Sequence, residues 1–375
     1  MINRERMVAE FFELVKITCS TRKEREVADR IKEKLAAMGG EVSEDNTGDI
    51  IGGNAGNVWA HFPGTKPGAP RIMFSAHMDS VEPCAGIQPT LANGIITSAG
   101  DTVLGADDKA GVAAILEGLR TVLEQDLPRG DIQVVFTVAE EGGLNGSKHL
   151  DPVRLTADMG FVLDSGGAPG KIIITAPGQN QIDITVYGKT AHAGVAPEEG
   201  VNAIVVAGHA LAALQQGRID FETTANIGRI SGGGATNIVT DKVEITAEAR
   251  SRNPEKLAAQ TKHMVDTFET VAAAHGGRAA VQVKKAYDPY VLSEDMPVVR
   301  ICRQAAEALE LPVSLEGTGG GSDANYFNRY GVPSAVLGVG MSKVHTNDEY
   351  IKEEHLYQAA ELVVSIVRQS ATGRR

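Results

Sequence analysis

The sequence predicts an α/β fold: a mostly parallel sheet flanked by helices, with a smaller α+β domain inserted into it. In residues 1–177 short continuous apolar runs alternate with a helix-like segment, as expected of strands that are buried on both faces. Over residues 178–288 apolar side chains alternate with polar ones, which is typical of strands with one solvated face. The first pattern resumes over residues 289–375. We therefore expect one discontinuous domain that is interrupted by a second, smaller one.

The first domain alternates between helical and strand-like segments. Thr21 and Glu24 have the spacing of a capping box, so we expect a helix to begin there. Three apolar runs predict buried strands at residues 72–74, 132–138 and 161–163. The segment between the first two runs has one apolar face, which predicts a helix over residues 112–123. This alternation of strand, helix and strand favours parallel pairing.

The inserted segment follows the order strand, helix, strand, strand, helix, strand, which is the split βαβ or ferredoxin-like arrangement. Its expected strands cover residues 182–186, 223–230, 242–249 and 279–283, and its expected helices cover 202–215 and 254–274. Beyond it we expect a helix at 298–309, a strand at 335–337 and a last helix from Glu353. The C-terminal part of the chain therefore completes the larger domain.

Composition excludes several classes of function. The chain of 375 residues carries 36 Lys and Arg against 48 Asp and Glu, and its net charge of −12 disfavours binding to nucleic acid or to an anionic membrane. No stretch approaches the ~18 apolar residues of a membrane span, and the N-terminus lacks the apolar core of a signal peptide. The three cysteines (Cys19, Cys84 and Cys302) show no metal-binding spacing. We expect a cytoplasmic protein without disulfides or Cys-ligated zinc.

Histidines and acids follow the ends of the predicted strands, which is where ligands bind in open α/β sheets. His77 and Asp79 come directly after the first strand. Because residues i and i+2 of an extended chain point to the same side, the imidazole and the carboxylate face one crevice. One use of such a pair is a metal-ligating histidine that a carboxylate orients. Taken alone, the pair is more often a surface feature.

Two pairs of adjacent acids follow. Asp107 and Asp108 open a helix, where taken alone they are best explained as capping residues. Glu140 and Glu141 follow an apolar strand, and adjacent carboxylates repel each other unless a cation is present. Because neighbouring side chains diverge, one of the two is able to bind a metal while the other acts on water.

Asp164 ends the strand at residues 161–163, and His345 follows a glycine-rich strand end. Taken together with the other acids, these residues form a set of histidine and carboxylate ligands without cysteine. Such a set suits zinc, cobalt or manganese in a hydrolytic site. Two metals ~3.5–4 Å apart that share one carboxylate would stabilise a nucleophile and the developing negative charge together.

Six motifs carry a resemblance that extends over essentially the whole chain. They are SAHMDS at 75–80, LGADDKAG at 104–111, EEG at 140–142, Asp164, GKTAH at 188–192 and GGGSDA at 319–324. With these motifs the sequence resembles the di-zinc aminoacylase/carboxypeptidase clan of metallo-exopeptidases, and within it the peptidase T-like tripeptide aminopeptidases. LGADDKAG is the most specific of the six.

The resemblance implies a centre of two divalent metal ions, zinc in the first place, with cobalt or manganese as alternatives. Asp107 would bridge the two ions. His77 and Asp164 would hold one of them, and Glu141 and His345 the other. The resemblance also implies a cis peptide bond after Asp107.

It further implies an exopeptidase of short peptides with a metal-bound hydroxide as the nucleophile. Glu140 would be the general base, and Asp79 would orient His77. In this clan Asp rather than Glu at position 164 favours aminopeptidase or tripeptidase action. The alternative is a deacylase or carboxypeptidase of the same clan that acts on N-acyl amino acids.

The inserted domain would act as a lid and as the contact of a homodimer. By resemblance His192 helps to hold the scissile carbonyl oxygen, in its own site or in that of the neighbouring subunit. Peptidase T tends to have proline after this histidine, and Ala193 stands here, which indicates a divergent subgroup.

Four further residues are expected to bind the peptide substrate. By resemblance Arg250 would clamp its terminal carboxylate, which suits a planar fork of donors, with Arg252 as a competitor for this role. Asn237 follows a glycine-rich loop and would bind substrate backbone. Gly319 and Gly320 would allow the substrate to approach the chain closely.

Overall fold

The computed structural model describes residues 2–372. It divides into two compact units. The first unit comprises residues 2–174, 291–317 and 322–372. The second unit comprises Thr175–Tyr290 and Thr318–Gly321. No helix among the described residues combines the length and the apolar character needed to cross a bilayer.

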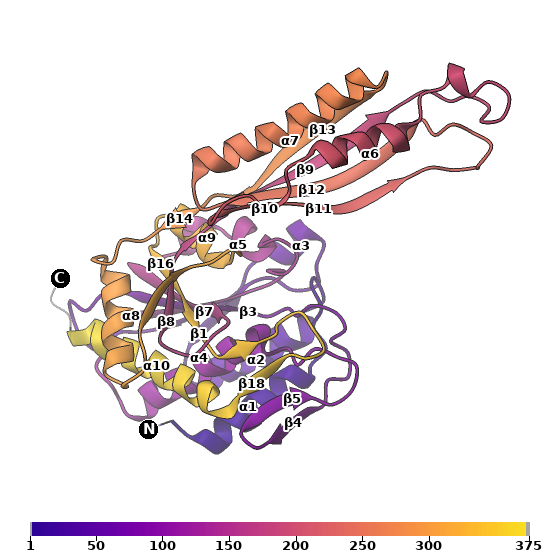
Figure 1. Ribbon diagram of the computed structural model, residues 1–375. Helices are drawn as coiled ribbons and strands as arrows, with labels where there is room; N and C mark the ends of the chain where they lie inside the picture. The colour runs from indigo at the N-terminus through magenta and orange to yellow at the C-terminus, as the bar shows by residue number, and fades with distance from the viewer. Residues whose placement is uncertain (1, 373–375) are drawn as a thin grey trace. The chain divides into compact units, whose positions relative to one another are not determined.

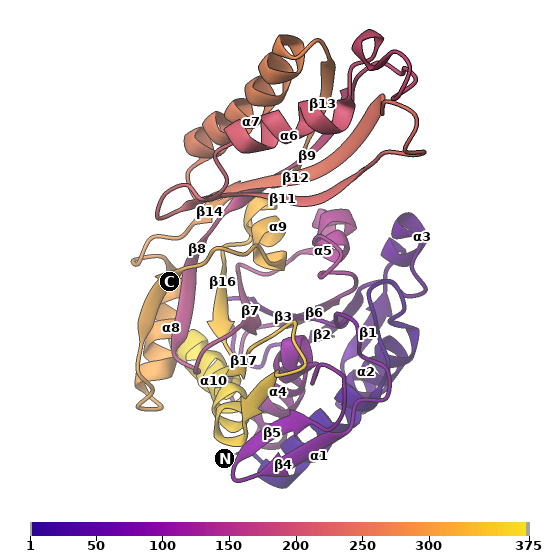
Figure 2. The same ribbon diagram turned by 45° about the vertical axis from the view of Figure 1, so that its right-hand side comes forward.

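The first unit is built on one large sheet, in which the strands follow the order β1-β2-β6-β3-β7-β16-β8-β14, with β15 beside β8 (Figure 2). Its centre consists of four parallel strands: β6 (Ile132–Thr137), β3 (Ile72–His77), β7 (Met159–Ser165) and β16 (Ser334–Gly338). These strands are almost wholly buried, as their continuous apolar runs predicted.

Further strands complete the sheet and include antiparallel pairs. They are β1 (Glu41–Glu44), β2 (Val58–Phe62), β8 (Lys171–Ala176), β14 (Tyr290–Val291) and β15 (Ser314–Gly317). A small separate sheet has the order β17-β18-β5-β4. Its strands are β17 (Met341–Ser342), β18 (Tyr350–Lys352), β5 (Ile95–Ser98) and β4 (Pro89–Ala92).

Helix α4 (Ala106–Glu124) packs against β3 and β7 and is the element that brings two aspartates to the sheet. A side chain at Gly111 would meet the carbonyl oxygen of Leu163 at 2.1 Å, so only glycine allows the first turns of α4 to lie against the end of β7. The other helices of the unit are α1 (Arg4–Lys16), α2 (Arg25–Ala37), α3 (Thr47–Ile51), α5 (Asn145–His149), α8 (Pro297–Glu307), α9 (Asp323–Arg329) and α10 (Glu353–Thr372).

The prediction of a capping box at Thr21 and Glu24 is wrong. Helix α2 begins at Arg25, Glu24 is its N-cap, and the Glu24 side chain makes no capping hydrogen bond. Both side chains instead contact residues far along the chain, namely Asp79 and Ala139. Buried backbone N–H groups and a buried carboxylate compete with the helix end for these side chains, and a sequence window of four residues does not reveal that competition.

The second unit is a five-stranded antiparallel sheet of order β10-β11-β12-β9-β13 with two helices on one face (Figure 1). The strands are β9 (Gly178–Tyr187), β10 (Gly217–Arg218), β11 (Thr223–Gly232), β12 (Lys242–Ser251) and β13 (Arg278–Tyr287). The helices are α6 (Ala203–Ala213) and α7 (Pro254–Ala274). Alternate residues of β12 (Val243, Ile245, Ala247 and Ala249) enter the core beneath these helices. The predicted fold class is therefore confirmed, including the smaller α+β part.

Candidate functional site

The acids and histidines that follow the strand ends gather at one edge of the large sheet. His77 is the last residue of β3, Glu140 and Glu141 follow β6, and Asp164 lies in the last part of β7. Because these strands are parallel neighbours, their carboxyl ends meet at the same edge. The first turn of α4 adds Asp107 to the same cluster.

Asp107 lies between two histidines. One carboxylate oxygen, Oδ1, is 3.0 Å from His77 Nε2, and the other, Oδ2, is 3.2 Å from His345 Nε2. The peptide bond after Asp107 is cis, as the resemblance implied. The N–H of Asp107 donates to the Glu349 carboxylate at 2.9 Å, which fixes the backbone of this residue. A carboxylate with one oxygen facing each histidine has the arrangement of a bridging ligand.

A further acid stands beside each histidine. Asp164 Oδ1 is 3.8 Å from His77 Nε2, and Glu141 Oε1 is 2.8 Å from His345 Nε2. Three groups of donor atoms are close enough together to hold a metal ion: His77 with Asp107 and Asp164, Asp107 with Glu141 and His345, and His77 with Glu140 and Glu141. The first two groups share Asp107 and match the two sets of ligands that the resemblance implied. Neutral imidazole and carboxylate donors fit a divalent cation of the zinc type.

Asp79 supports the cluster from behind. Its carbonyl oxygen is 3.1 Å from His77 Nδ1, and its carboxylate oxygen Oδ1 is 3.4 Å from the same nitrogen. The carboxylate also accepts the backbone N–H groups of Glu140 at 3.0 Å and of Glu141 at 3.3 Å. Asp79 is fully buried, so a single side chain connects the orientation of the His77 ring to the position of both glutamates.

The cluster concentrates negative charge in a buried place. Burial raises the pKa of Glu140 well above its usual range, and the neighbouring Asp164 carboxylate adds to this shift. Burial also acts upward on the pKa of Asp107, but the contacts with His345 and His77 outweigh it and hold that pKa below its usual range. The site therefore requires positive charge, which imidazolium ions or divalent cations are able to supply.

Sequence reasoning missed several residues that hold this cluster. The Glu349 carboxylate accepts the N–H groups of Gly105 and Asp107, and nothing in the local sequence pattern marks it. Lys109 is buried and donates to the carbonyl oxygen of Asp79 at 3.2 Å and to the Ser80 hydroxyl at 2.7 Å. Lys109 lies inside the LGADDKAG motif, which was the available signal for it.

His192 and Asn237 lie next to each other in the second unit. The N–H of Ala193 donates to the carbonyl oxygen of Asn237 at 2.9 Å, and His192 forms an isolated β-bridge with Ile238. Both His192 and Asn237 are exposed. The N–H of Gly194 donates to His192 Nδ1 at 3.2 Å, which makes that nitrogen the acceptor and places the proton of the neutral ring on Nε2.

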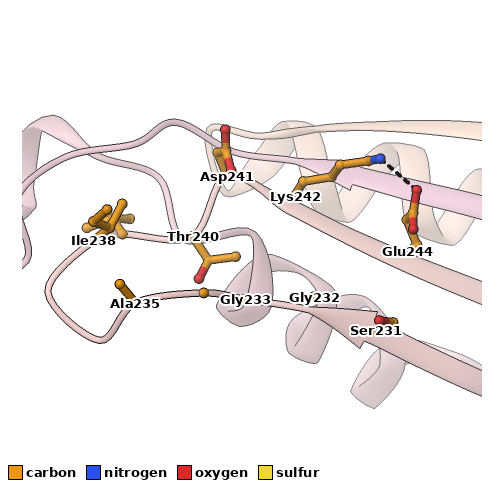
Figure 3. A pocket seen from close by; sticks show the side chains of 11 residues that line it. Ser231, Gly232, Gly233, Ala235, Ile238, Thr240, Asp241, Lys242 and Glu244 are labelled. Carbon is orange, nitrogen blue, oxygen red and sulfur yellow. Dashed lines mark hydrogen bonds and ion pairs between the residues drawn. The ribbon is translucent and has the colours of Figure 1, made fainter.

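The loop that carries Asn237 borders a pocket of about 330 Å³ on the second unit (Figure 3). Gly232, Gly233 and Gly234 form one side of it. Of its charged residues Asp241, Lys242 and Glu244, the last two are paired with each other at 2.6 Å (Figure 3). Neither ion-paired residue belongs to the cluster of the first unit.

Arg250 lies at the other end of β12 from Lys242. Its guanidinium pairs with the Glu248 carboxylate through two contacts of 2.8 and 3.0 Å, and Gln179 donates to the same carboxylate. Arg252 instead lies over the Phe221 ring, with the guanidinium carbon 5.7 Å from the ring centre. The structure therefore does not bring Arg250 together with His192 and Asn237 within this unit.

Gly319 and Gly320 belong to the short segment 318–321, which clusters with the second unit. The N–H of Thr318 donates to the carbonyl oxygen of Thr175 at 3.0 Å, and the N–H of Gly320 donates to the Thr318 hydroxyl at 3.2 Å. Nothing lies within 4 Å of where a Gly319 side chain would begin, so packing within the chain does not explain this glycine.

Comparison with known proteins identifies the family. The model of "Peptidase family M20/M25/M40" matches residues 73–369. One similar structure is the crystal structure of aminopeptidase PepT from Bacillus cereus, which is 46% identical in sequence and has a TM-score of 0.91. The alignment covers 99% of this chain and 100% of the PepT chain. The crystal structure of a tripeptidase from Staphylococcus aureus is 41% identical in sequence and has a TM-score of 0.95, with an alignment that covers 100% of both chains. YqjE of Bacillus subtilis, an uncharacterised protein, is 44% identical over 99% of this chain and 100% of its own. The chain therefore belongs to peptidase family M20/M25/M40 and is a metallopeptidase.

Proposed function

We propose that this metal-dependent exopeptidase of short peptides acts as a tripeptide aminopeptidase with two divalent metal ions, zinc in the first place. The observation that carries the proposal is the Asp107 carboxylate, whose two oxygens face His77 and His345 separately. The names of two similar structures, an aminopeptidase and a tripeptidase, support the choice of substrate.

The ligands of the proposed centre follow from the donor groups. His77, Asp107 and Asp164 would hold one ion, and Asp107, Glu141 and His345 the other. Two bound divalent ions supply Lewis acidity, which lowers the pKa of a coordinated water and withdraws electrons from a peptide carbonyl. The protein contributes the orientation of the ligands. Asp79 contacts the His77 ring and accepts the N–H of Glu140, and Glu349 accepts the N–H of Asp107.

Glu140 would move the proton. Within residues 2–372 no hydrogen bond or ion pair joins its carboxylate to another side chain, whereas its neighbour Glu141 contacts His345. A carboxylate that no other side chain engages suits a group that takes a proton from the attacking water and gives it to the leaving amine. The hydrogen bond from its backbone N–H to Asp79 keeps this carboxylate at the edge of the cluster.

His192 supports the carbonyl oxygen of the scissile bond. Its Nδ1 is occupied by the N–H of Gly194, so Nε2–H is the available donor of the neutral ring. A donor that is aimed at the oxygen as negative charge develops there stabilises the transition state. Asn237, which is held against the neighbouring residue Ala193, would bind substrate backbone from the same loop region.

The distance between His192 and Arg250 supports a homodimer. Lys242 and Arg250 lie eight residues apart along β12, which corresponds to roughly 26 Å at the rise of a strand. His192 is bridged to Ile238, beyond the Lys242 end. A tripeptide spans only about 10 Å. One bound tripeptide is therefore too short to reach both residues of one chain, and we infer that His192 serves the site of a partner subunit.

The lid domain, residues 178–288, would provide the contact between the subunits. Its helix α6 exposes Ile204 and Val205, and its strand β11 exposes Ile230. Exposed apolar side chains of this kind are typical of protein–protein contacts when they are grouped. The three cysteines are buried free thiols, which supports the proposed cytoplasmic location.

The substrate class is tested by comparing a tripeptide, a dipeptide and an N-acetyl amino acid with zinc-loaded protein. We expect the tripeptide to be cleaved fastest, with release of its N-terminal residue. Cleavage of the N-acetyl amino acid alone would replace the proposal by the deacylase alternative. Metal analysis of the same preparation should give about two ions per chain, and a value near zero after supplementation with zinc would refute the metal centre.

A further inference from the structure

The turn formed by residues 20–24 lies beside the chain segment that follows His77. Ser20 forms a parallel bridge with Ser80, and the N–H of Ser80 donates to the carbonyl oxygen of Cys19 at 3.0 Å. The turn thus adjoins the chain just after His77 and Asp79. None of its residues belongs to the donor groups that are able to hold a metal.

Two buried carboxylates bind three consecutive backbone N–H groups. The N–H of Ala139 donates to Glu24 Oε1 at 3.0 Å, and those of Glu140 and Glu141 donate to the two oxygens of Asp79. Ala139 has a φ of 50°, a conformation that L-residues other than glycine adopt rarely and at a cost. The turn that carries Glu140 and Glu141 therefore depends on acceptors that hold it in place.

Glu24 is an unusual residue to find in this position. Its side chain is fully buried, and Oε1 also accepts the N–H of Arg22 at 2.7 Å. The second oxygen, Oε2, is buried without a hydrogen-bond partner among the described residues. Burial of a carboxylate with an unsatisfied oxygen costs stability, and a neutral residue would avoid that cost. The hydrogen bonds from the N–H groups of Arg22 and Ala139 give a reason for an acceptor side chain at this position.

Thr21 supports the same turn from the other side. Its hydroxyl donates to Asp79 Oδ2 at 2.8 Å, the oxygen that also accepts the N–H of Glu141. A side chain at Gly142 would come within 2.8 Å of the Thr21 methyl group, so the two turns are in close contact. The turn therefore supports the Glu140–Glu141 backbone in two ways. Thr21 orients the acceptor Asp79, and Glu24 is itself the acceptor for Ala139.

We propose that Glu24 is a positioning residue that places Glu140 and Glu141 through the N–H of Ala139, and that Thr21 assists it by orienting Asp79. This inference rests on the proposed function, because it assigns Glu140 to proton transfer and Glu141 to a metal ion. The proposal also explains why Thr21 and Glu24 stand three residues apart, although neither side chain caps helix α2. Glu24 acts through the backbone and touches neither substrate nor metal.

The test compares Glu24→Ala and Glu24→Gln with a matched control, Glu26→Gln, which changes an exposed acid in the first turn of the same helix. Zinc affinity is measured by competition with a chromophoric chelator, and kcat and KM are measured separately with a tripeptide. For Glu24→Ala we expect zinc affinity and kcat to fall by about 10- to 100-fold, the range for outer residues that support metal ligands. KM should change by less than about threefold, because substrate contacts are untouched.

Glu24→Gln should recover most of the loss, because its amide oxygen still accepts the N–H of Ala139. Glu26→Gln should match the wild type in all three quantities. A Glu24→Ala protein that is merely less stable, with wild-type zinc affinity and kcat, would overturn the proposal. Failure of the wild type itself to bind zinc would instead count against the proposed function, so the two failures are distinguishable.

Thr21→Val gives a second route if Glu24→Ala does not fold. Valine keeps the methyl group that faces Gly142 and replaces the hydroxyl donor to Asp79 by a methyl group of similar size. We expect zinc affinity to fall by about tenfold, the lower end of the same range. Wild-type affinity and kcat in Thr21→Val would contradict the part that this turn plays in positioning Asp79.

Discussion

The proposed metal centre of the first unit and the proposed substrate residues of the second unit differ in how firmly they are held. His77 and Asp79 are at most 1% exposed, and contacts from other elements hold each of them. The His345 side chain is 50% exposed, but it is held by its contacts with Asp107 and Glu141. His192 and Asn237 are exposed and lie on connecting segments of the second unit. One region is thus organised before any substrate arrives, whereas the residues of the other are exposed to solvent.

This difference indicates that the first region serves the chemical step and the second serves substrate binding. A preorganised, buried cluster is suited to stabilise charge in a transition state. Exposed residues on loops are suited to admit a substrate and to close around it. Changes in the first region should therefore affect metal binding or turnover, and changes in the second should leave the metal content intact.

The largest expected effect distinguishes two neighbours within the buried cluster. Glu140→Gln removes the proposed base, and we expect kcat to fall by about 10³-fold with two metal ions still bound. Glu141→Gln removes a proposed ligand instead, and we expect the metal content to fall together with kcat. Metal analysis and steady-state kinetics on both variants check this pair. Unchanged turnover in Glu140→Gln would remove Glu140 from its role.

The next effect concerns the exposed region. His192→Ala removes the proposed donor to the carbonyl oxygen, and kcat should fall by about 10²-fold while the metal content stays the same. If His192 serves the partner's site, mixed dimers of His192→Ala with Glu140→Gln contain one complete site. Co-expression of the two inactive variants should then restore about a quarter of wild-type activity, as random pairing in a twofold dimer requires. No recovery in verified mixed dimers would show that His192 acts in its own chain.

A third effect follows from the burial of Glu24. Burial raises the pKa of this carboxyl to about 7 from its usual 4.5, and the Asp79 carboxylate adds to the shift. Below pH 4.5 both the folded and the unfolded chain carry the proton, so ionisation costs the folded state nothing. As the pH rises from 4.5 to 7 the unfolded chain ionises first, and the wild type loses stability that it does not regain at higher pH.

Glu24→Gln does not titrate, so its free energy of unfolding relative to the wild type should rise by about 2 kcal/mol between pH 5 and pH 8. Urea unfolding of the metal-free proteins at both values measures this difference. Glu26→Gln, an exposed change in the same helix, should show a flat difference. A flat difference for Glu24→Gln as well would contradict the raised pKa.

The sequence predicted the residues of the buried cluster because their positions follow from a general rule. His77, Glu141 and Asp164 each come at or just after the end of an apolar strand, and parallel pairing brings such ends together. The same reasoning applies to the fold, since continuous and alternating apolar patterns distinguish the two sheets. The catalytic and ligand roles themselves stay predictions until the variants are measured.

The supporting residues were not predictable in this way, because their contacts join distant parts of the chain. Glu24 reaches Ala139 across 115 residues, and Glu349 reaches Gly105 across 244. Local spacing even misled at Thr21 and Glu24, where it predicted a helix cap. For the second unit the sequence grouped Arg250 with His192, and only the length of β12 shows that they are far apart.

The smallest expected effect decides between the two arginines of the second unit. Arg250 lies on β12 with its guanidinium fixed by Glu248, whereas Arg252 lies over Phe221. A planar fork that is already oriented suits a carboxylate, and lysine cannot reproduce its paired contacts. Arg250→Lys should therefore raise KM for a tripeptide by about tenfold with little change in kcat, and Arg252→Lys should change KM by less than about twofold.

The same measurement on a C-terminally amidated tripeptide supplies the control, because without the carboxylate the wild type should already bind as weakly as Arg250→Lys. If Arg250→Lys raises KM equally for both peptides, the residue does not bind the carboxylate, and its pairing with Glu248 serves only the packing of the second unit.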